Sequence, residues 1–298
     1  MPLPKFSYLW PRNLKEASAL LVEHGDKAKV LAGGTDLLIR MSHRAVTPDY
    51  LIGLKALSGL DQVTYHPDTG LTIGALARLA EVADHPEILA VYPALSHAAQ
   101  MTATVQIRNM GTVAGNICNA APSADTAPPL LVYEAEVQIV HPGGERSLPM
   151  HDFFRGPGLT ALETGEIVKE IRLPAPDRRT GSCYQKLSAR SKVDIAAVGI
   201  AALVQLDESG RCRQARLALG AVAPVPLRAR RTEKMLLGER LEPDLLREAG
   251  AGAADEASPI SDVRASAQYR RQMIQVLTER ALSDSLSMAQ QKIAGCDA

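Results

Sequence analysis

Two glycine-bearing segments of the chain contain the residue types that bind phosphate groups. In the first, Gly33, Gly34, Thr35 and Asp36 directly follow an apolar run that begins at Lys29. Glycines let the backbone approach a ligand and tolerate positive φ, so successive N–H groups can point at phosphate oxygens. Alone, this segment is a weak signal, because a structural turn between a strand and a helix explains it somewhat better. Because Asp36 would repel a pyrophosphate, we interpret it as a helix cap or a hydroxyl acceptor.

The second segment runs from Arg108 to Asn116 and continues into a proline-bracketed stretch that ends at Asp125. It offers small residues, the hydroxyl of Thr112 and the amide of Asn116, which can both donate and accept. We expect a long loop between Arg108 and Pro129, and a loop of this length inside a compact domain is usually functional. Together the two segments predict one diphosphate-containing ligand, clamped from two sides.

Other chemistries lack support in the sequence. It has neither G-x-G-x-x-G nor the P-loop pattern, no H-E-x-x-H, and no grouping of Ser, His and Asp. Its cysteines, Cys118, Cys183, Cys212 and Cys296, are too far apart for a zinc or iron–sulfur site. We therefore expect no catalytic side chains and no metal ligands in this chain.

The overall charge and hydropathy limit the kinds of partner and the cellular location that we expect. A formal net charge of zero gives no reason to propose nucleic acid or an anionic membrane as the partner. No apolar run approaches the roughly 18–20 residues that span a bilayer, and the first residues do not read as a signal peptide. We expect a cytoplasmic protein with no membrane insertion.

The elements that position these segments follow from capping residues and apolar patterns. In the first part, Asn13 predicts the start of a helix over 14–24 and Gly25 its end, and the following elements are a strand at 29–32, a helix at 37–43 and a strand at 50–54. Further along we expect a hairpin at 63–73, helices at 76–83, 92–101 and 130–134, and strands at 136–140 and 166–173.

After a linker at Pro174, Ala175 and Pro176, the pattern changes to strands and then to long helices. The strands are expected at 183–188, 198–207 and 214–219, and the helices at 232–237, 244–254 and 265–290. This mixed order predicts an α+β chain of two or three units and not a regular βαβ array.

In this order, the motifs resemble those of the flavoprotein subunits of the xanthine dehydrogenase, carbon monoxide dehydrogenase and 4-hydroxybenzoyl-CoA reductase family. That family's signatures read A-G-G-[TSH]-[DS]-L, [IV]-R-N-x-G-[TS]-[IVA]-G-G-N and P-x-[AS]-D. Here they correspond to residues 32–37, 107–116 and 122–125, and the resemblance continues at 194–196 and 219–226. It covers nearly the whole chain.

The resemblance implies a fold, a cofactor and partners. The fold would be a vanillyl-alcohol-oxidase-type (PCMH) FAD-binding domain over 1–176, with subdomains at about 1–57 and 58–176. A C-terminal domain over 177–298 would combine an antiparallel sheet with a helical bundle. FAD would be the cofactor of this chain, which would exchange electrons between iron–sulfur clusters and an external carrier. A large partner subunit would hold the molybdopterin cofactor and a small one the [2Fe-2S] clusters, in a dimer of heterotrimers.

By position, the resemblance also implies a set of cofactor-binding residues. They are Lys29, Val30, Leu31, Ala32, Gly33, Gly34, Thr35, Asp36, Thr102, Gly111, Thr112, Val113, Ala114, Gly115, Asn116, Asp125, Val168, Lys169 and Lys186. One departure is Ala114, which replaces the first glycine of the usual Gly-Gly-Asn. No cysteine-bearing insertion of the kind that holds a further [4Fe-4S] cluster is present, so the resemblance implies a chain that carries flavin only.

Three alternatives remain open on the sequence alone. The chain could be a stand-alone FAD-dependent oxidase or reductase, which would need an acid–base constellation that we do not find. It could be a non-catalytic assembly subunit that has lost FAD, in view of Ala114. It could also be an ATPase of the sugar-kinase type, for which the second phosphate hairpin and the metal-binding aspartate are missing.

Overall fold

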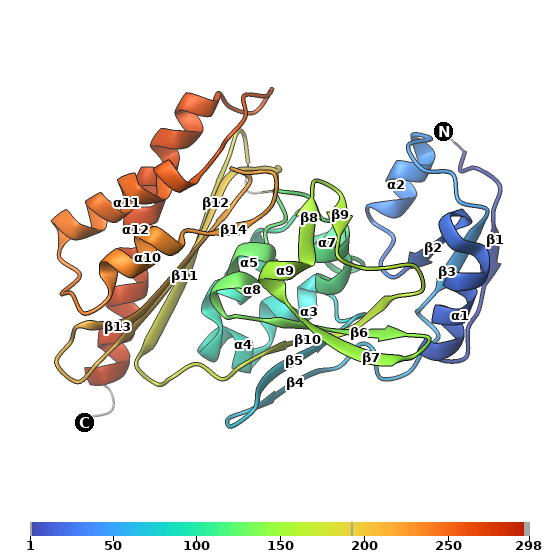
Figure 1. Cartoon of the computed structure of the whole chain (residues 1–298), viewed down its shortest axis with the longest axis horizontal. Helices are drawn as coiled ribbons and strands as arrows, with labels where there is room; N and C mark the ends of the chain where they lie inside the picture. Colours follow the sequence, from blue (N-terminus) through green and yellow to red (C-terminus); the bar gives the residue numbers. More distant parts are fainter. Residues whose placement is uncertain (1, 192, 295–298) are drawn as a thin grey trace.

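The computed structural model describes residues 2–191 and 193–294. Three main sheets follow one another along the chain, with the two ends of the protein at opposite ends of the molecule (Figure 1). The first sheet is parallel and the other two are antiparallel. The fold therefore mixes helices and sheets, as the sequence predicts.

The N-terminal unit is a three-stranded parallel sheet in the order β1-β3-β2, joined by short helices. Its elements are β1 (Ser7–Leu9), α1 (Leu14–His24), a 3-10 turn (Gly25–Lys27), β2 (Ala28–Leu31), α2 (Leu37–Ser42) and β3 (Tyr50–Gly53). The predicted caps of α1 are confirmed, because the Asn13 side chain accepts from the N–H of Glu16 and Gly25 ends the helix with a φ of 51°. Asp36 stands at the N-cap position of α2, but its side chain makes no capping hydrogen bond, so that part of the interpretation is wrong.

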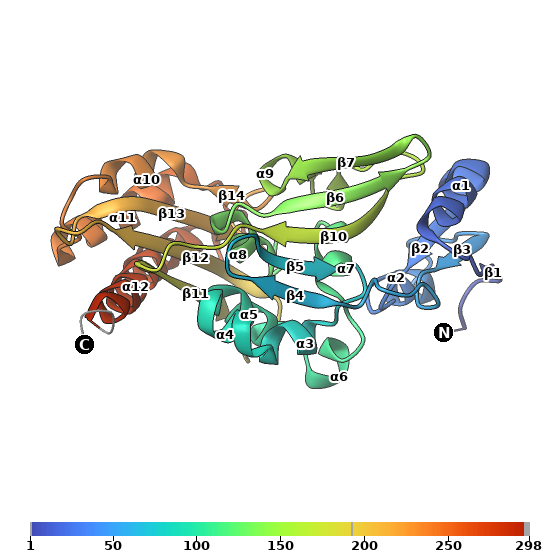
Figure 2. The same cartoon turned by 90° about the horizontal axis from the view of Figure 1, so that it is seen from below.

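The middle unit is built on a five-stranded antiparallel sheet in the order β4-β5-β10-β6-β7. The strands are β4 (Val63–His66), β5 (Gly70–Gly74), β6 (Glu136–His141), β7 (Gly144–Pro149) and β10 (Ile167–Leu173). The helices are α3 (Leu79–Asp84), α4 (Pro86–Val91), α5 (Pro93–Met101), α6 (Val105–Arg108), α7 (Val113–Cys118), α8 (Ala127–Val132) and α9 (Met150–Phe153), and a small hairpin joins β8 (Phe154–Gly156) to β9 (Leu159–Thr160). Helices α3 to α6 gather on one side of the sheet (Figure 2).

Two predictions for this unit are wrong. Helix α3 begins at Leu79 and not at residue 76, because the preceding residues pair with other segments: Arg78 forms a β-bridge with Thr112, and the N–H of Leu76 bonds to Leu60. The loop expected between residues 108 and 129 contains helix α7. This short helix is stabilised by burial of Val113 and Ile117 in the core, which outweighs the low helix propensity of Gly115.

The C-terminal unit is a four-stranded antiparallel sheet covered by three helices. Its elements are β11 (Thr180–Ser188), β12 (Ala196–Leu206), β13 (Cys212–Gly220), β14 (Leu227–Arg228), α10 (Arg230–Leu236), α11 (Pro243–Glu256) and α12 (Ala267–Ala294). The predicted strands and helices of this region are confirmed, with boundaries that shift by a few residues. Cys296 lies outside the described residues.

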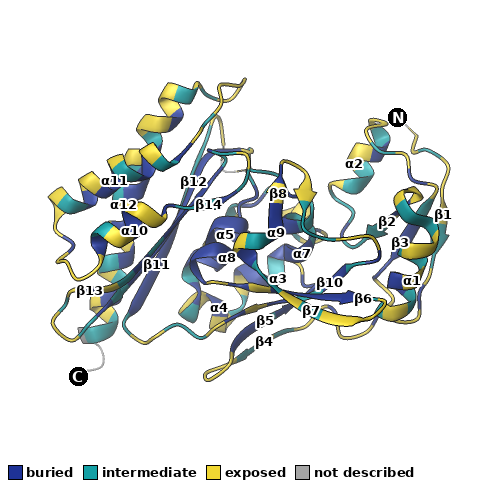
Figure 3. Ribbon diagram, viewed as in Figure 1, coloured by how far each residue is buried: buried dark blue, intermediate teal, exposed yellow. Residues whose placement is uncertain are grey.

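The C-terminal sheet is buried on both faces. Alternate residues of β12 face opposite ways: Ile200 packs with the helices α10 to α12, whereas Ala201 and Leu203 join the core of the middle unit. Strand β12 is consequently buried over nearly its whole length (Figure 3). This shared core fixes the C-terminal sheet against the middle unit.

Candidate functional site

The two glycine-bearing segments meet in space, as loop 1 (residues 32–36, after β2) and loop 2 (residues 109–112, before α7). A Cβ atom on Gly33 would lie 2.2 Å from the carbonyl oxygen of Met110 and 2.9 Å from the Cα of Gly111. A Cβ on Gly111 would in turn lie 3.3 Å from the hydroxyl oxygen of Thr35. The backbones of the two loops are therefore in direct contact, and position 33 admits no side chain.

Beside this contact the loops share one open cleft with a volume of about 280 Å³. Most of the residues expected to bind the cofactor line it. They are Lys29, Val30, Leu31, Ala32, Gly33, Gly34, Thr35, Asp36, Thr102, Gly111, Thr112, Ala114, Gly115, Asn116 and Val168.

Helix α7 presents polar groups to the cleft. Thr112 is its N-cap, and the hydroxyl oxygen of Thr112 accepts from the N–H of Gly115 at 2.9 Å. Its single hydroxyl proton is thereby left for a ligand. Ala114, the residue that departs from the family pattern, is only 4% exposed, and its methyl group belongs to the core of the middle unit. Most of that side chain is therefore turned away from the cleft.

Four of the expected residues do not line the cleft. Val113 is fully buried in the core, and the amino group of Lys169 binds Glu145 at 3.0 Å on the neighbouring hairpin. Asp125 and Lys186 are paired with each other inside the protein, at 2.8 Å between Nζ and Oδ2.

The Asp125–Lys186 pair lies at the edge of the cleft, between the middle unit and β11. Lys186 also donates to the carbonyl oxygen of Met101 at 2.9 Å, next to Thr102, which lines the cleft. The hydroxyl of Tyr184 donates to the second carboxylate oxygen of Asp125 at 2.7 Å. Burial raises the pKa of Asp125, and the adjacent Lys186 opposes that rise. The pair joins the C-terminal sheet to the segment that follows α7.

The charges around the cleft include two groups that the sequence reasoning missed. Glu166 lines the cleft, but its carboxylate binds Arg146 through two contacts of 2.6 Å, which also lower the pKa of Glu166. Arg40 lines the cleft without a side-chain hydrogen bond to any described residue. The sequence does contain a signal for Arg40: it lies four residues after Asp36, a spacing at which two side chains of a helix face each other. Partial burial raises the pKa of Asp36, and the positive charge of Arg40 opposes the rise.

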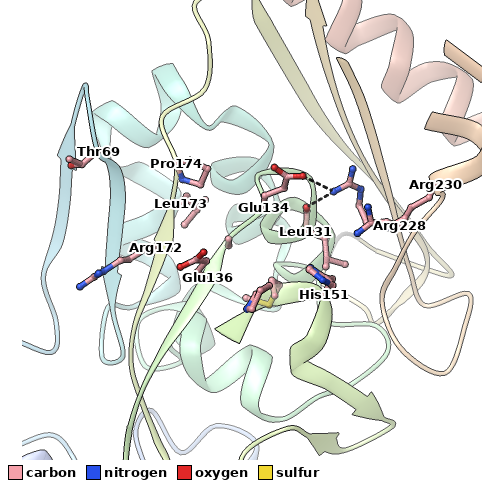
Figure 4. Close-up of a pocket in the computed structure, with 13 residues that line it drawn as sticks. Thr69, Leu131, Glu134, Glu136, His151, Arg172, Leu173, Pro174, Arg228 and Arg230 are labelled. Atoms are coloured by element: carbon pink, nitrogen blue, oxygen red, sulfur yellow. Dashed lines mark hydrogen bonds and ion pairs between the residues drawn. The ribbon is translucent and has the colours of Figure 1, made fainter. Parts of the chain in front are cut away.

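A second cavity lies between the middle unit and β14, and within it Arg228 contacts Glu134 and Leu131 (Figure 4). Arg228 binds Glu233 and donates to the carbonyl oxygen of Leu131 at 3.3 Å. Arg172 lines the same cavity and is paired with Glu170. This cavity offers no arrangement of a nucleophile and a base.

The described residues contain neither a metal-binding cluster nor a membrane-spanning helix. Within 2–191 and 193–294, no group of three or more His, Cys, Asp and Glu side chains is placed to hold a metal ion. Over the same residues, no helix has the length and apolar character needed to cross a membrane. The cysteine next to the cleft, Cys118, has its thiol pKa raised to about 12 by burial, which keeps it protonated and unreactive at neutral pH.

Comparisons with known proteins agree along the whole chain. Residues 4–176 match the family described as "FAD binding domain in molybdopterin dehydrogenase", and residues 183–285 match the "CO dehydrogenase flavoprotein C-terminal domain". The xanthine dehydrogenase FAD-binding subunit of Escherichia coli O157:H7 is 34% identical over 288 residues, which is 96% of this chain and 98% of that protein.

Solved structures give the same result. A chain of carbon monoxide dehydrogenase from Hydrogenophaga pseudoflava superimposes with a TM-score of 0.92 at 34% identity, covering 97% of this chain and 99% of that chain. A chain of quinoline 2-oxidoreductase from Pseudomonas putida 86 superimposes with a TM-score of 0.90 at 29% identity, with the same coverage.

Proposed function

The chain belongs to the family of FAD-binding subunits of molybdopterin dehydrogenases, and on that premise we propose that FAD binds in the cleft with its diphosphate between loop 1 and loop 2. The observation that carries the proposal is the contact of Gly33 with Met110, which brings both glycine-bearing segments to one cavity.

The function follows from membership of this family. The chain is the FAD-binding, electron-transferring subunit of a heteromeric molybdenum hydroxylase or dehydrogenase, and the substrate reaction takes place on a partner subunit. The redox chemistry is that of the flavin, while the protein binds and orients it. The molybdopterin cofactor and the iron–sulfur clusters belong to partner subunits. This assignment replaces the sugar-kinase alternative.

The residues of the cleft fit a dinucleotide. The backbone of loop 1 approaches the ligand through Gly33 and Gly34, and the latter has a φ of 78°, which favours glycine. The hydroxyl groups of Thr35 and Thr112 provide donors, and Asn116 adds an amide. Because Arg146 neutralises Glu166, the cations Lys29 and Arg40 outweigh the remaining carboxylate, Asp36. The site can therefore accept a diphosphate.

The assignment is tested by the absorption spectrum of the purified chain. We expect an oxidised-flavin band near ~450 nm and release of FAD, not FMN, when the protein is denatured. A colourless protein that takes up no added FAD would contradict the proposal and would favour an assembly subunit without cofactor.

The finer architecture of the protein and its complex is also a proposal. We infer a vanillyl-alcohol-oxidase-type FAD domain over 1–176, with subdomains at about 1–57 and 58–176, and a C-terminal domain over 177–298. We further infer a cytoplasmic dimer of heterotrimers with one large and one small partner subunit. Co-expression with the neighbouring genes, followed by mass measurement and metal analysis of the purified complex, tests the assembly. A chain that stays monomeric and active without partners would contradict it.

Arg40 provides a second test of the position of the diphosphate. If its free guanidinium group faces the phosphates, Arg40→Gln should raise the Kd for FAD about fivefold at low ionic strength. The difference should shrink at about 0.5 M salt, because exposed charges are screened there. Lys15→Gln removes an exposed cation from helix α1, none of whose residues line the cleft, and serves as the control. Equal effects of the two substitutions would show that Arg40 acts only through net charge.

A further inference from the structure

The amide of Asn116 is held in one orientation by a buried hydroxyl group. Asn116 lines the cleft from α7, and its Oδ1 accepts a hydrogen bond of 2.6 Å from the hydroxyl of Thr126. Thr126 is 0% exposed, so no water competes for this proton. Although Thr126 is the N-cap of α8, its side chain makes no capping hydrogen bond. Among the described residues, the Thr126 hydroxyl therefore has Asn116 as its only hydrogen-bond partner.

This contact decides which end of the amide is available to a ligand. A side-chain amide has nearly the same shape in its two orientations, but one end only accepts hydrogen bonds and the other only donates them. With Oδ1 bound to Thr126, the NH₂ group of Asn116 remains. The NH₂ group has no hydrogen bond to any described residue, and its nitrogen is not fully buried. The NH₂ group is thus reachable from the cleft.

We propose that Thr126 is a positioning residue for FAD: it holds Asn116 so that the amide donates to the cofactor instead of presenting an oxygen to it. Phosphate groups carry only acceptor oxygens, as do the carbonyl groups of a flavin, so a donor in this place attracts the ligand and an oxygen repels it. The inference rests on the proposed binding of FAD in the cleft.

The segment that carries Thr126 is itself fixed. The preceding residue, Asp125, is held by Lys186 and Tyr184, and the N–H of Leu130 bonds to the carbonyl oxygen of Thr126. If the amide turned over, the Thr126 hydroxyl could accept from the NH₂ group, but its own buried proton would then have no acceptor among the described residues. The observed orientation is therefore the stable one. Without that hydroxyl, both orientations of the amide become available, and part of the population presents its oxygen to the cofactor.

A double-mutant cycle on the full chain, freed of FAD and titrated with it, tests the inference through the Kd measured by flavin fluorescence. Thr126→Val keeps the shape and removes the proton, and we expect it to raise the Kd about tenfold. Thr126→Ser should stay within about twofold of the wild type, since it restores the donor. In the presence of Asn116→Ala, the valine substitution should add less than about twofold, because the two residues act as a unit.

Several outcomes would overturn the inference while leaving the cleft assignment intact. One is an unchanged Kd in Thr126→Val. Another is a double variant whose fold-change in Kd equals the product of the fold-changes of Thr126→Val and Asn116→Ala. If Thr126→Val fails to fold, Asn116→Asp decides, because it keeps the acceptor for Thr126 and replaces the NH₂ group with an oxygen. Its Kd should exceed that of Asn116→Ala, and the reverse order contradicts the inference. A wild-type chain that binds no FAD would instead refute the proposed function.

Discussion

Replacing Gly33 with valine is expected to abolish FAD retention while the C-terminal unit stays folded. Any Cβ at this position would overlap the carbonyl oxygen of Met110, which is backbone and cannot rotate away. Loop 1 and loop 2 would have to separate, and the groups that face the diphosphate from the two sides would lose their common position. Overpacking of this kind also costs about 1–3 kcal/mol in the free energy of unfolding.

The flavin-to-protein ratio of the purified variant measures the first effect, and hydrogen exchange of strand β12 measures the integrity of the C-terminal sheet. Gly156→Ala is a matched control, since a Cβ there would meet only Leu159 at an ordinary 3.5 Å. We expect Gly33→Ala to lose flavin and Gly156→Ala to keep it. If the Gly33→Val protein retained its full flavin content, the contact between loop 1 and loop 2 would not be the basis of FAD binding.

The parts of the fold that the sequence predicts are those with local signals. Asn13 and Gly25 mark the two ends of α1 because a helix terminus needs partners for its free N–H and carbonyl groups. The apolar run at 198–207 predicts a strand, and the structure has β12 at Ala196–Leu206. These patterns depend on residues that are close in the sequence, so they can be recognised without knowledge of the tertiary structure.

The remaining features depend on contacts between distant segments. Helix α7 contains Gly115 and is only six residues long, so its local preference indicates a loop, and burial of its apolar side adds to the Thr112 cap in making it helical. Composition shows that Gly33 suits a tight turn, but not that its Cα faces Met110. Likewise, nothing near Thr126 in the sequence reveals that its hydroxyl binds Asn116. Motif resemblance could indicate most of the residues that line the cleft, but it could not reveal the contacts that these residues make with one another.

Lys186→Met is expected to give the largest loss of stability of any single substitution in this region. The side chains of Lys186 and Asp125 are 1% and 8% exposed, so the variant leaves a buried carboxylate whose remaining side-chain partner is the Tyr184 hydroxyl. Breaking one side of a buried ion pair typically costs about 3–5 kcal/mol in the free energy of unfolding. Urea unfolding followed by circular dichroism measures the cost.

The pH dependence of that loss distinguishes an unpaired charge from a simple packing defect. Burial already raises the pKa of Asp125, and Lys186 is the strongest influence that opposes the rise, so the substitution must raise it further. A carboxyl group whose pKa is higher in the folded state binds more protons when the protein is folded. Such a group favours the folded state at low pH, and this contribution is lost as the pH rises above about 4, the usual pKa of an aspartate. The deficit relative to the wild type should therefore be smaller at about pH 5 than at about pH 8.

Removing the charge from the partner provides the decisive comparison. In Asp125→Asn combined with Lys186→Met, the carboxylate is gone and the amide oxygen can still accept from Tyr184, so much of the lost stability should return. Because the pair ties β11 to the segment behind α7, the double variant should nevertheless bind FAD more weakly than the wild type. Equal destabilisation of the single and double variants at both pH values would mean that the pair contributes through shape alone. In that case the C-terminal sheet would position the cleft by packing and not by charge.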